Sequence, residues 1–157
     1  MTDRDALLER YRTGSDAVDA AVADLGDAEL DRRPSDGGWT ARQVAHHLAD
    51  SEAMAYTRIR RLVADADPRI EGYEEPRWAE RLHYDRPIRE SVAVVRAVRA
   101  ASLSLLEALT EEEWQRHGIH SESGAYSVDR WLEIYAAHPH DHARQIRAAA
   151  GRAPADE

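Results

Sequence analysis

Residues 40–64 of the chain read TARQVAHHLADSEAMAYTRIRRLVA, and their apolar side chains recur at the three- and four-residue spacing of an α-helix. Thr40 and Gln43 have the spacing of a capping box, in which each side chain hydrogen-bonds the backbone amide of the other residue. Asp67 and Pro68 mark the end of the pattern, because the residue before a proline avoids the helical conformation. We therefore expect a helix at residues 40 to about 64.

The same helical periodicity continues through most of the chain, and alternating strand patterns are hard to find. Further helices are expected at about 3–25, 87–109 and 127–150, and Thr110 with Glu113 forms a second capping-box pair. Polar loops are expected at 26–38 and 117–126, with a long connection at 65–87 that contains one helical turn near 76–82. Four such helices favour an all-α four-helix bundle, and a chain of 157 residues is expected to form a single domain over 1–157.

The charge and the cysteine content exclude several classes of protein. All 21 Lys and Arg positions are arginines against 30 Asp and Glu residues, so the formal net charge is -9 and nucleic-acid binding is disfavoured unless a local basic patch overrides this charge. The chain has no cysteine, which excludes disulfides, thiolate metal ligands and a cysteine nucleophile. It also lacks the roughly 18 unbroken apolar residues of a membrane span and a recognisable secretory signal. We expect a cytoplasmic protein without membrane or nucleic-acid partners.

Two of the eight histidines lie close to the centre of the apolar face of the helix expected at 127–150. His138 and His142 are four residues apart, so their side chains lie on successive turns and can reach one ion. His47 lies on the flank of the apolar face of the helix at 40–64. The alternative is that the pair are core or boundary histidines that hydrogen-bond carbonyl groups. The remaining histidines are expected at the surface or in loops: His46, His83, His117, His120 and His140.

Three neutral imidazoles would leave one coordination position open for water or a substrate, which is the catalytic rather than the structural arrangement of zinc. Without cysteine, the available donor atoms are nitrogen and oxygen, which suit zinc, nickel, iron or manganese. Pro139 stands between His138 and His142, where it cannot donate to the carbonyl of Tyr135 and costs about 3 kcal/mol in an ordinary helix. The proline either makes a harmless kink or aims His138 at the metal.

Three stretches of the chain carry a resemblance to a known family. Residues 38–51 read GWTARQVAHHLADS, residues 73–80 read YEEPRWAE, and residues 120–124 read HSESG and lead into YAAH at 135–138 and His142. In this order, over about 34–147, the chain resembles the DinB/YfiT-like metalloenzymes, and it is most similar to their YfiT branch, which includes bacillithiol transferases. His120 belongs to the third stretch, so its loop can border the site.

The resemblance implies an up-down-down-up four-helix bundle, often a dimer, in which three histidines bind one divalent metal ion. On the matching motifs these are His47, His138 and His142, the same residues that the helix faces bring together. Zinc or nickel is the expected metal, with iron or manganese as alternatives, and we expect a homodimer. A glycine is more usual in the family where Pro139 stands, so the local geometry of that helix can differ.

The YfiT branch implies a metal-dependent S-transferase that activates a low-molecular-weight thiol, similar to bacillithiol or mycothiol, for attack on an electrophile. A thiol that binds a metal is deprotonated near neutral pH. Arg144 and Arg42 are candidates to bind substrate carboxylates, and a solvated helix surface is the alternative for both. Trp39 and Tyr135 are candidates to line the substrate cavity, and an ordinary core position is their alternative.

Two other functions stay open from the sequence. A water on a three-histidine metal, with its pKa lowered to about 7, would make the protein a metal-dependent hydrolase. Such a site also needs a general base, and Glu52 is the nearest carboxylate that can face inward, with a solvated helix flank as its alternative. A non-enzymatic, stress-related binding module would instead hold a structural metal with a fourth protein ligand.

Overall fold

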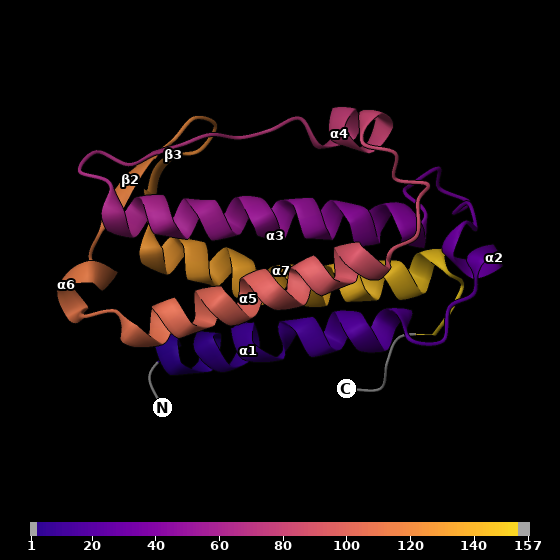
Figure 1. Cartoon of the computed structure of the whole chain (residues 1–157), viewed down its shortest axis with the longest axis horizontal. Helices are drawn as coiled ribbons and strands as arrows, with labels where there is room; N and C mark the ends of the chain where they lie inside the picture. Colours follow the sequence, from indigo (N-terminus) through magenta and orange to yellow (C-terminus); the bar gives the residue numbers. More distant parts are fainter. Residues whose placement is uncertain (1–2, 154–157) are drawn as a thin grey trace.

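Four long helices, packed side by side, make up most of the structure, a computed structural model that describes residues 3–153 (Figure 1). They are α1 (Asp3–Val22), α3 (Ala41–Ala64), α5 (Arg89–Ala108) and α7 (Val128–Ala149). In Figure 1, α1 and α7 run in one direction and α3 and α5 run in the other, which is the up-down-down-up order. The predicted all-α four-helix bundle is confirmed. Within residues 3–153, no helix combines the length and the apolar character needed to cross a membrane.

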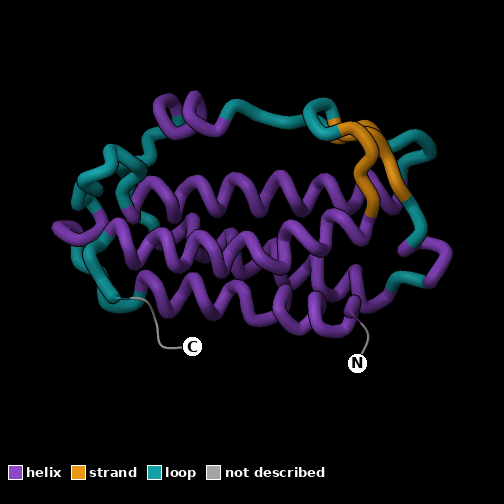
Figure 2. The backbone as a smooth tube through the Cα atoms, turned by 180° about the vertical axis from the view of Figure 1, so that it is seen from behind, coloured by secondary structure: helices purple, strands orange, loops and turns teal. Residues whose placement is uncertain are grey.

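Because α3 and α5 are parallel, the chain between them must return along the length of the bundle. A helix of 24 residues such as α3 is about 36 Å long. The return segment, residues 65–88, contains β1 (Arg69–Ile70) and α4 (Glu75–Arg81) and runs along the outer side of α3 (Figures 1 and 2). The helix α4 confirms the helical turn expected near 76–82.

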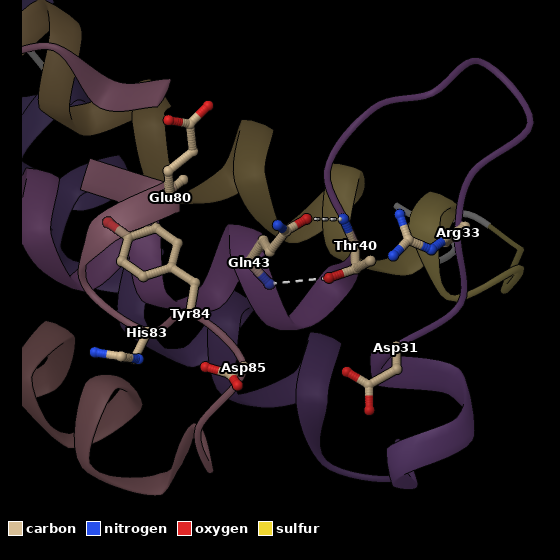
Figure 3. A pocket seen from close by; sticks show the side chains of 9 residues that line it. Asp31, Arg33, Thr40, Gln43, Glu80, His83, Tyr84 and Asp85 are labelled. Atoms are coloured by element: carbon tan, nitrogen blue, oxygen red, sulfur yellow. Dashed lines mark hydrogen bonds between the residues drawn. The ribbon is translucent and has the colours of Figure 1, made fainter. Parts of the chain in front are cut away.

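Capping side chains fix the starts of two helices at the predicted positions. Thr40 Oγ1 accepts from the Gln43 amide at 3.2 Å, and the Gln43 side chain accepts from the Thr40 amide at 3.0 Å (Figure 3). Thr110 and Glu113 form the second capping box in the same way, at the start of α6 (Glu111–Trp114). Both pairs confirm the expected helix starts, since each satisfies amides that have no partner inside the helix.

The stretch at 117–126 forms part of a small sheet, so the predicted polar loop was wrong there. In the sheet, β2 (His117–His120) pairs antiparallel with β3 (Gly124–Ser127) and parallel with β1. No strand of the sheet is longer than four residues, and Ile119, the one large apolar side chain of β2, is 44% exposed. The inward positions of β2 hold Gly118 and His120, so the sequence carries no apolar alternation that would reveal a strand.

Smaller differences from the predicted helix ranges occur at α1, α2 (Asp27–Leu30) and α5. The short helix α2 lies within the stretch 26–38 that was expected to be a loop. Its Leu30 is buried in the same apolar cluster as Val44 and Ile146, so packing rather than periodicity decides its conformation. In addition, α1 ends three residues before the expected 25 and α5 begins two residues after the expected 87.

The apolar core has two ends with a polar layer between them. At one end Trp131 is buried against Tyr11, and its indole N–H donates to the Ala55 carbonyl at 3.0 Å. Toward the other end, Val44 of α3 and Ile146 of α7 belong to a second apolar cluster. Between these ends, the inner faces of α3 and α7 carry histidine, serine and glutamate side chains. The polar layer therefore lies inside the bundle.

His46 is buried, so the predicted surface position was wrong. The residue is 0% exposed, its Nδ1 lies 2.7 Å from the Ser91 hydroxyl, and its Nε2 lies 2.9 Å from the Arg86 carbonyl. The face of α3 that carries His46 is covered by α5 and by the end of the return segment, which periodicity alone does not reveal. Burial lowers the pKa of His46, and the neutral ring joins α3 to these two segments.

Gly14 of α1 lies directly against Pro139 of α7, and α7 stays helical on both sides of the proline. A Cβ atom at position 14 would lie 2.4 Å from Pro139 Cγ and 2.7 Å from Nη2 of Arg99. Real Cβ atoms essentially never come within 3.0 Å of another residue's atoms, so the helices would have to move apart. The missing side chain at Gly14 therefore permits the contact between α1 and α7.

We predict that Gly14→Ala lowers the free energy of unfolding by about 1–3 kcal/mol, because overpacking a buried contact costs that much. The sign of this change distinguishes the two cases, since a Gly→Ala substitution in an open helix interior would instead raise the free energy of unfolding by roughly 1 kcal/mol. Urea denaturation measures the change, with Gly26→Ala as the control because a Cβ there would meet no atom within 4 Å. A Gly14→Ala protein as stable as the wild type would contradict the close contact.

Candidate metal centre

His47 of α3 and His138 and His142 of α7 come together in the polar layer of the bundle. One ring nitrogen of each histidine lies within 4.8 Å of those of the other two. The four-residue spacing places the two α7 rings 4.5 Å apart between centroids, and His47 faces them from the neighbouring helix. The structure thus brings together the three side chains that the helix faces predicted to meet, and we call them the histidine triad.

Two hydrogen bonds determine which nitrogen of each α7 histidine is free to bind a cation. Nδ1 of His138 lies 3.2 Å from Oε1 of Glu52, and Nδ1 of His142 lies 2.7 Å from Oε1 of Gln145. Both oxygens accept, so each Nδ1 donates, and in the neutral tautomer each Nε2 carries the lone pair. The two Nε2 atoms face each other at 3.1 Å, close to the roughly 3.3 Å between two nitrogen ligands of a tetrahedral zinc. In that tautomer the two lone pairs point toward one another, an arrangement that a cation bound to both would stabilise.

His47 also has the properties of a metal ligand. Its Nδ1 is buried and has no hydrogen-bond partner among residues 3–153, so the ring is not committed to another group of the described chain on that side. Burial, together with the neighbouring His142 and His138, lowers the pKa of His47 to about 3. The ring therefore stays neutral near pH 7, as a metal ligand must. The residues of the triad fit one divalent cation.

Glu52 is buried behind His138. Its side chain is 1% exposed, both carboxylate oxygens accept from Nη1 of Arg99 at 3.0 Å, and Oε1 also accepts from Nδ1 of His138. In this position the carboxylate orients the His138 ring, as carboxylates behind metal-binding histidines commonly do. The position does not fit the predicted general base, because Arg99 and His138 already occupy the carboxylate. The alternative of a solvated helix flank was wrong.

Arg99 of α5, which the sequence analysis did not identify, holds the other side of Glu52. Its Nη1 also donates to the Tyr135 carbonyl at 3.1 Å, and its Nη2 donates to the Tyr11 carbonyl at 2.6 Å. The Tyr135 carbonyl is free to accept because Pro139, four residues later, has no N–H to offer it. The proline therefore supplies an acceptor for the buried arginine, a role that neither prediction for Pro139 included.

A signal for this buried ion pair is present in the sequence. Arg99 comes four residues after Val95 and seven before Leu106, which is a core position in the apolar spacing of α5. Glu52 occupies the equivalent position on α3, four residues after Leu48. Opposite charges at core positions of two helices indicate a pair that is buried between them, because a lone buried charge is too costly.

Two of the predicted substrate-lining residues touch the triad. The ring centroid of Trp39 lies 4.9 Å from that of His47, and the centroid of Tyr135 lies 5.6 Å from that of His138. Tyr135 is 3% exposed and belongs to the core, whereas Trp39 is half-buried just before α3 begins. Tyr135 also lines the cavity that His138 borders, whereas Trp39 lines a different one, and the role of both in substrate binding stays a prediction.

The two arginines predicted to bind substrate carboxylates have other partners. Arg42 is buried and pairs with Asp27 at 2.7 Å and with Asp31 at 2.6 Å, so neither the predicted substrate-binding role nor the alternative of a solvated surface fits it. The two aspartates belong to the α2 region, which was expected to be a loop and gave no sign of this contact. Arg144 is exposed and pairs with Asp141 on the same helix, which matches the alternative of a solvated surface.

A cavity of about 290 Å³ lies beside the triad, and His138 forms part of its wall. Glu75, at the start of α4, lines the same cavity, and its Oε2 lies 4.0 Å from Nε2 of His47. His120 of β2 also lines the cavity and is 8% exposed, so its predicted surface position was wrong, although it does border the site. The return segment and the small sheet therefore complete the wall that the four helices begin.

A larger cavity, of about 550 Å³, lies near the start of α3 and is shown in Figure 3. Its wall includes the capping pair Thr40 and Gln43 and the exposed His83, but no member of the triad. We therefore place the functional site at the smaller cavity. His83 and His117 are exposed as predicted, whereas His140 is half-buried and its Nε2 lies 2.9 Å from the Arg10 carbonyl.

Known proteins resemble this chain over most of its length. A family model described as the DinB superfamily matches residues 10–146. A protein of Oceanobacillus iheyensis named "Putative metal-dependent hydrolase" is 38% identical over 131 residues, which are 83% of this chain and 76% of that protein. A Bacillus cereus protein of the same name is 30% identical over 142 residues, 90% of this chain and 82% of that one.

A solved structure shares the fold. YfiT from Bacillus subtilis, described as "a probable metal-dependent hydrolase with an unusual four-helix bundle topology", superposes on this chain with a TM-score of 0.86. The two sequences are 26% identical, and the match covers 98% of this chain and 91% of YfiT. The similarity therefore extends through all four long helices.

We predict that Glu52→Gln and Arg99→Met each lower the free energy of unfolding of the metal-free protein by about 3 kcal/mol or more, because each leaves a buried charge without its partner. The double variant should lose at least about 1 kcal/mol less than the sum of the two single losses, since it removes both charges. Urea denaturation of the four proteins gives the coupling energy.

The control is Arg130→Met, which removes an exposed ion pair with Glu133 and should cost no more than about 0.5 kcal/mol. Additive losses in the double variant would show that Arg99 and Glu52 do not depend on each other.

Proposed function

The chain belongs to the DinB superfamily, and from that premise we propose that it is an enzyme whose histidine triad binds one divalent metal ion. The observation that carries the proposal is the pair of Nε2 atoms of His138 and His142, which face each other at 3.1 Å while both Nδ1 atoms are hydrogen-bonded elsewhere. His47 adds a third imidazole, one ring nitrogen of which lies within 4.8 Å of a ring nitrogen of each of the other two. The names of the relatives, which describe metal-dependent hydrolases, support the same proposal.

The donor set favours a catalytic site over a structural one. Structural zinc usually has four protein ligands, whereas catalytic zinc has three and an open position. Within residues 3–153, the ligand atoms of His47, His138 and His142 lie within 4.8 Å of one another. No fourth His, Asp or Glu side chain of these residues joins that group. This observation supports an enzyme rather than the binding module with a structural metal.

Zinc or nickel is the proposed metal, with iron or manganese as alternatives, because imidazole nitrogen suits all four. The charges of Glu52 and Arg99 cancel each other, so a divalent ion bound by three imidazoles would retain its positive charge toward the cavity. When bound, such an ion acts as a Lewis acid and lowers the pKa of a thiol or water ligand. An anionic nucleophile is therefore the species that the site is suited to hold.

For the reaction itself we propose S-transfer from a low-molecular-weight thiol, similar to bacillithiol, to an electrophile. The thiol loses its proton to solvent, and its sulfur forms a bond to an electrophilic carbon. The bond from that carbon to a halide breaks and releases the halide, or a carbon–oxygen bond of an epoxide breaks and the oxygen takes up a proton from solvent. The motifs at 38–51, 73–80 and 120–124, which resemble the YfiT branch, support this proposal. Because the chain contains no cysteine, the sulfur nucleophile must arrive with the substrate.

A second candidate, hydrolysis of an amide or ester, is favoured by one specific contact. Glu75 is partly exposed in the cavity wall, and its Oε2 lies 4.0 Å from Nε2 of His47, where it can take a proton from a water beside the triad. Glu75 therefore replaces Glu52 as the candidate general base. The names of the relatives agree with hydrolysis as well.

We predict that the wild-type chain binds one divalent ion and that His47→Ala, His138→Ala and His142→Ala each weaken binding at least tenfold. Each substitution removes one of three ligands from the site. Equilibrium dialysis with elemental analysis measures the affinity and the stoichiometry. His140→Ala is the matched control, because His140 lies on the same helix and bonds a backbone carbonyl instead. Unchanged affinity in a triad variant would contradict that ligand.

We predict that the metal-loaded protein conjugates a bromobimane-type electrophile to a thiol, tested with bacillithiol, mycothiol and a simple thiol. Glu75→Gln should change this rate less than threefold, because a metal-bound thiol needs no general base. Any ester or amide hydrolysis should instead fall at least 100-fold in Glu75→Gln. Glu74→Gln is the control, because the exposed Glu74 pairs with Arg77 and does not line the cavity. A protein that transfers no thiol but hydrolyses with this dependence on Glu75 would establish the second candidate.

A further inference from the structure

Arg58 of α3 lines the cavity beside the triad. It follows His47 by eleven residues, about three helical turns, so both side chains lie on the same face of α3. The cavity wall also contains Ser51 and Tyr135, together with His138. The arginine is therefore the cationic side chain that shares a cavity with the proposed metal site.

The contacts of Arg58 leave its charge without a counter-ion. Nη1 donates to the Tyr135 hydroxyl at 2.9 Å and Nη2 donates to the Glu71 carbonyl at 2.8 Å, both of which are neutral acceptors. The Nε atom is buried and has no hydrogen-bond partner in the part of the chain that the structure describes. Over the same residues, no carboxylate lies within ion-pair distance of Arg58. By contrast, Arg42 and Arg61 on the same helix each have an aspartate partner.

The position of Arg58 relative to the triad is set by Tyr135. The tyrosine hydroxyl accepts from Arg58, and the centroid of its ring lies 5.6 Å from that of His138. Tyr135 thus contacts both the guanidinium of Arg58 and the ring of His138, and all three residues line the same cavity of about 290 Å³. A ligand in this cavity borders both Arg58 and His138.

Other charges in the cavity wall restrict the kind of anion that fits. Glu75 and Glu122 both line the cavity, and Glu122 packs against Gly72, where a Cβ would come within 2.4 Å of its carboxyl carbon. These carboxylates repel a multiply charged anion such as phosphate more strongly than a singly charged one. A guanidinium also matches the geometry of a carboxylate, which can accept two of its N–H groups.

We propose that Arg58 is the carboxylate-binding residue of the substrate site, and that the substrate of the triad carries a carboxylate a few bonds from the group that reaches the metal. The proposal rests on the proposed function, because it places the reacting group of the substrate at the triad. It identifies the substrate class as short carboxylic acids that carry a thiol or another metal-binding group. Neither Arg42 nor Arg144, the arginines predicted for this role, lines the cavity.

The test is a binding measurement on the protein loaded with cobalt(II), whose visible spectrum reports a ligand at the metal. Two matched pairs of probes are titrated: mercaptoethanol against mercaptopropionate, and imidazole against imidazole acetate. The proteins are the wild type, Arg58→Gln and Arg60→Gln. Arg60 is the matched control, because it lies two residues further along α3, donates to the Tyr56 carbonyl and is outside the cavity wall. Cobalt stoichiometry shows whether each variant keeps its fold and its metal site.

We expect the wild type and Arg60→Gln to prefer the carboxylate member of each pair, and Arg58→Gln to lose at least tenfold of that preference. In one outcome, neither thiol binds cobalt, but the protein prefers imidazole acetate over imidazole and loses this preference in Arg58→Gln. This outcome would support the carboxylate site and contradict S-transfer. Thiols that bind with the same carboxylate preference in Arg58→Gln as in the wild type would overturn the role of Arg58 and leave the proposed function standing. If Arg58→Gln does not hold cobalt, Arg58→Lys takes its place. A wild type that shows no preference for the carboxylate probes would overturn the role of Arg58 and leave the proposed function standing.

Discussion

The buried ion pair between Arg99 and Glu52 is the interaction on which the rest of the polar layer depends. Two charges that are 2% and 1% exposed persist inside a bundle only if most of their polar atoms are hydrogen-bonded, and among the described residues the Nε atom of Arg99 is the one polar side-chain atom of this pair without a partner. Arg99 donates to Glu52 and to the carbonyls of Tyr11 and Tyr135, and Glu52 also accepts from His138. These residues come from α1, α3, α5 and α7, so one network joins all four long helices and ends on a histidine of the triad.

Two residues that break local rules are explained by this network. Pro139 costs α7 a hydrogen bond, but the carbonyl that it frees, that of Tyr135, accepts from Arg99. Gly14 is an unfavourable residue inside a helix, but any larger side chain there would collide with Pro139 and with the guanidinium of Arg99. At both positions the chain therefore has a residue of low helix propensity, because the contact with the buried Arg99 requires a glycine at 14 and a proline at 139.

Periodicity and capping predicted the elements that are long or locally determined, including the helix start at Thr40, the four-helix bundle and the meeting of the triad. The resemblance to the DinB and YfiT proteins is confirmed by the family model and by the shared fold. The failures are tertiary. His46 is covered by segments that are distant in sequence. The strand β2 was not predicted because its large apolar side chain, Ile119, points outward. Arg58 was not predicted because it lines a cavity that the return segment and the small sheet help to enclose. The homodimer and the cytoplasmic location stay predictions.

The central claim is that the buried pair and Gln145 hold His138 and His142 so that their Nε2 atoms share one cation with His47. X-ray absorption spectroscopy of the zinc-loaded wild type tests it most directly, because the method counts imidazole ligands around the metal. The account predicts three imidazole nitrogens at about 2.0–2.1 Å and one further ligand that exchanges when a small thiol is added. Fewer than three imidazoles, or a fourth ligand from the protein, would contradict it.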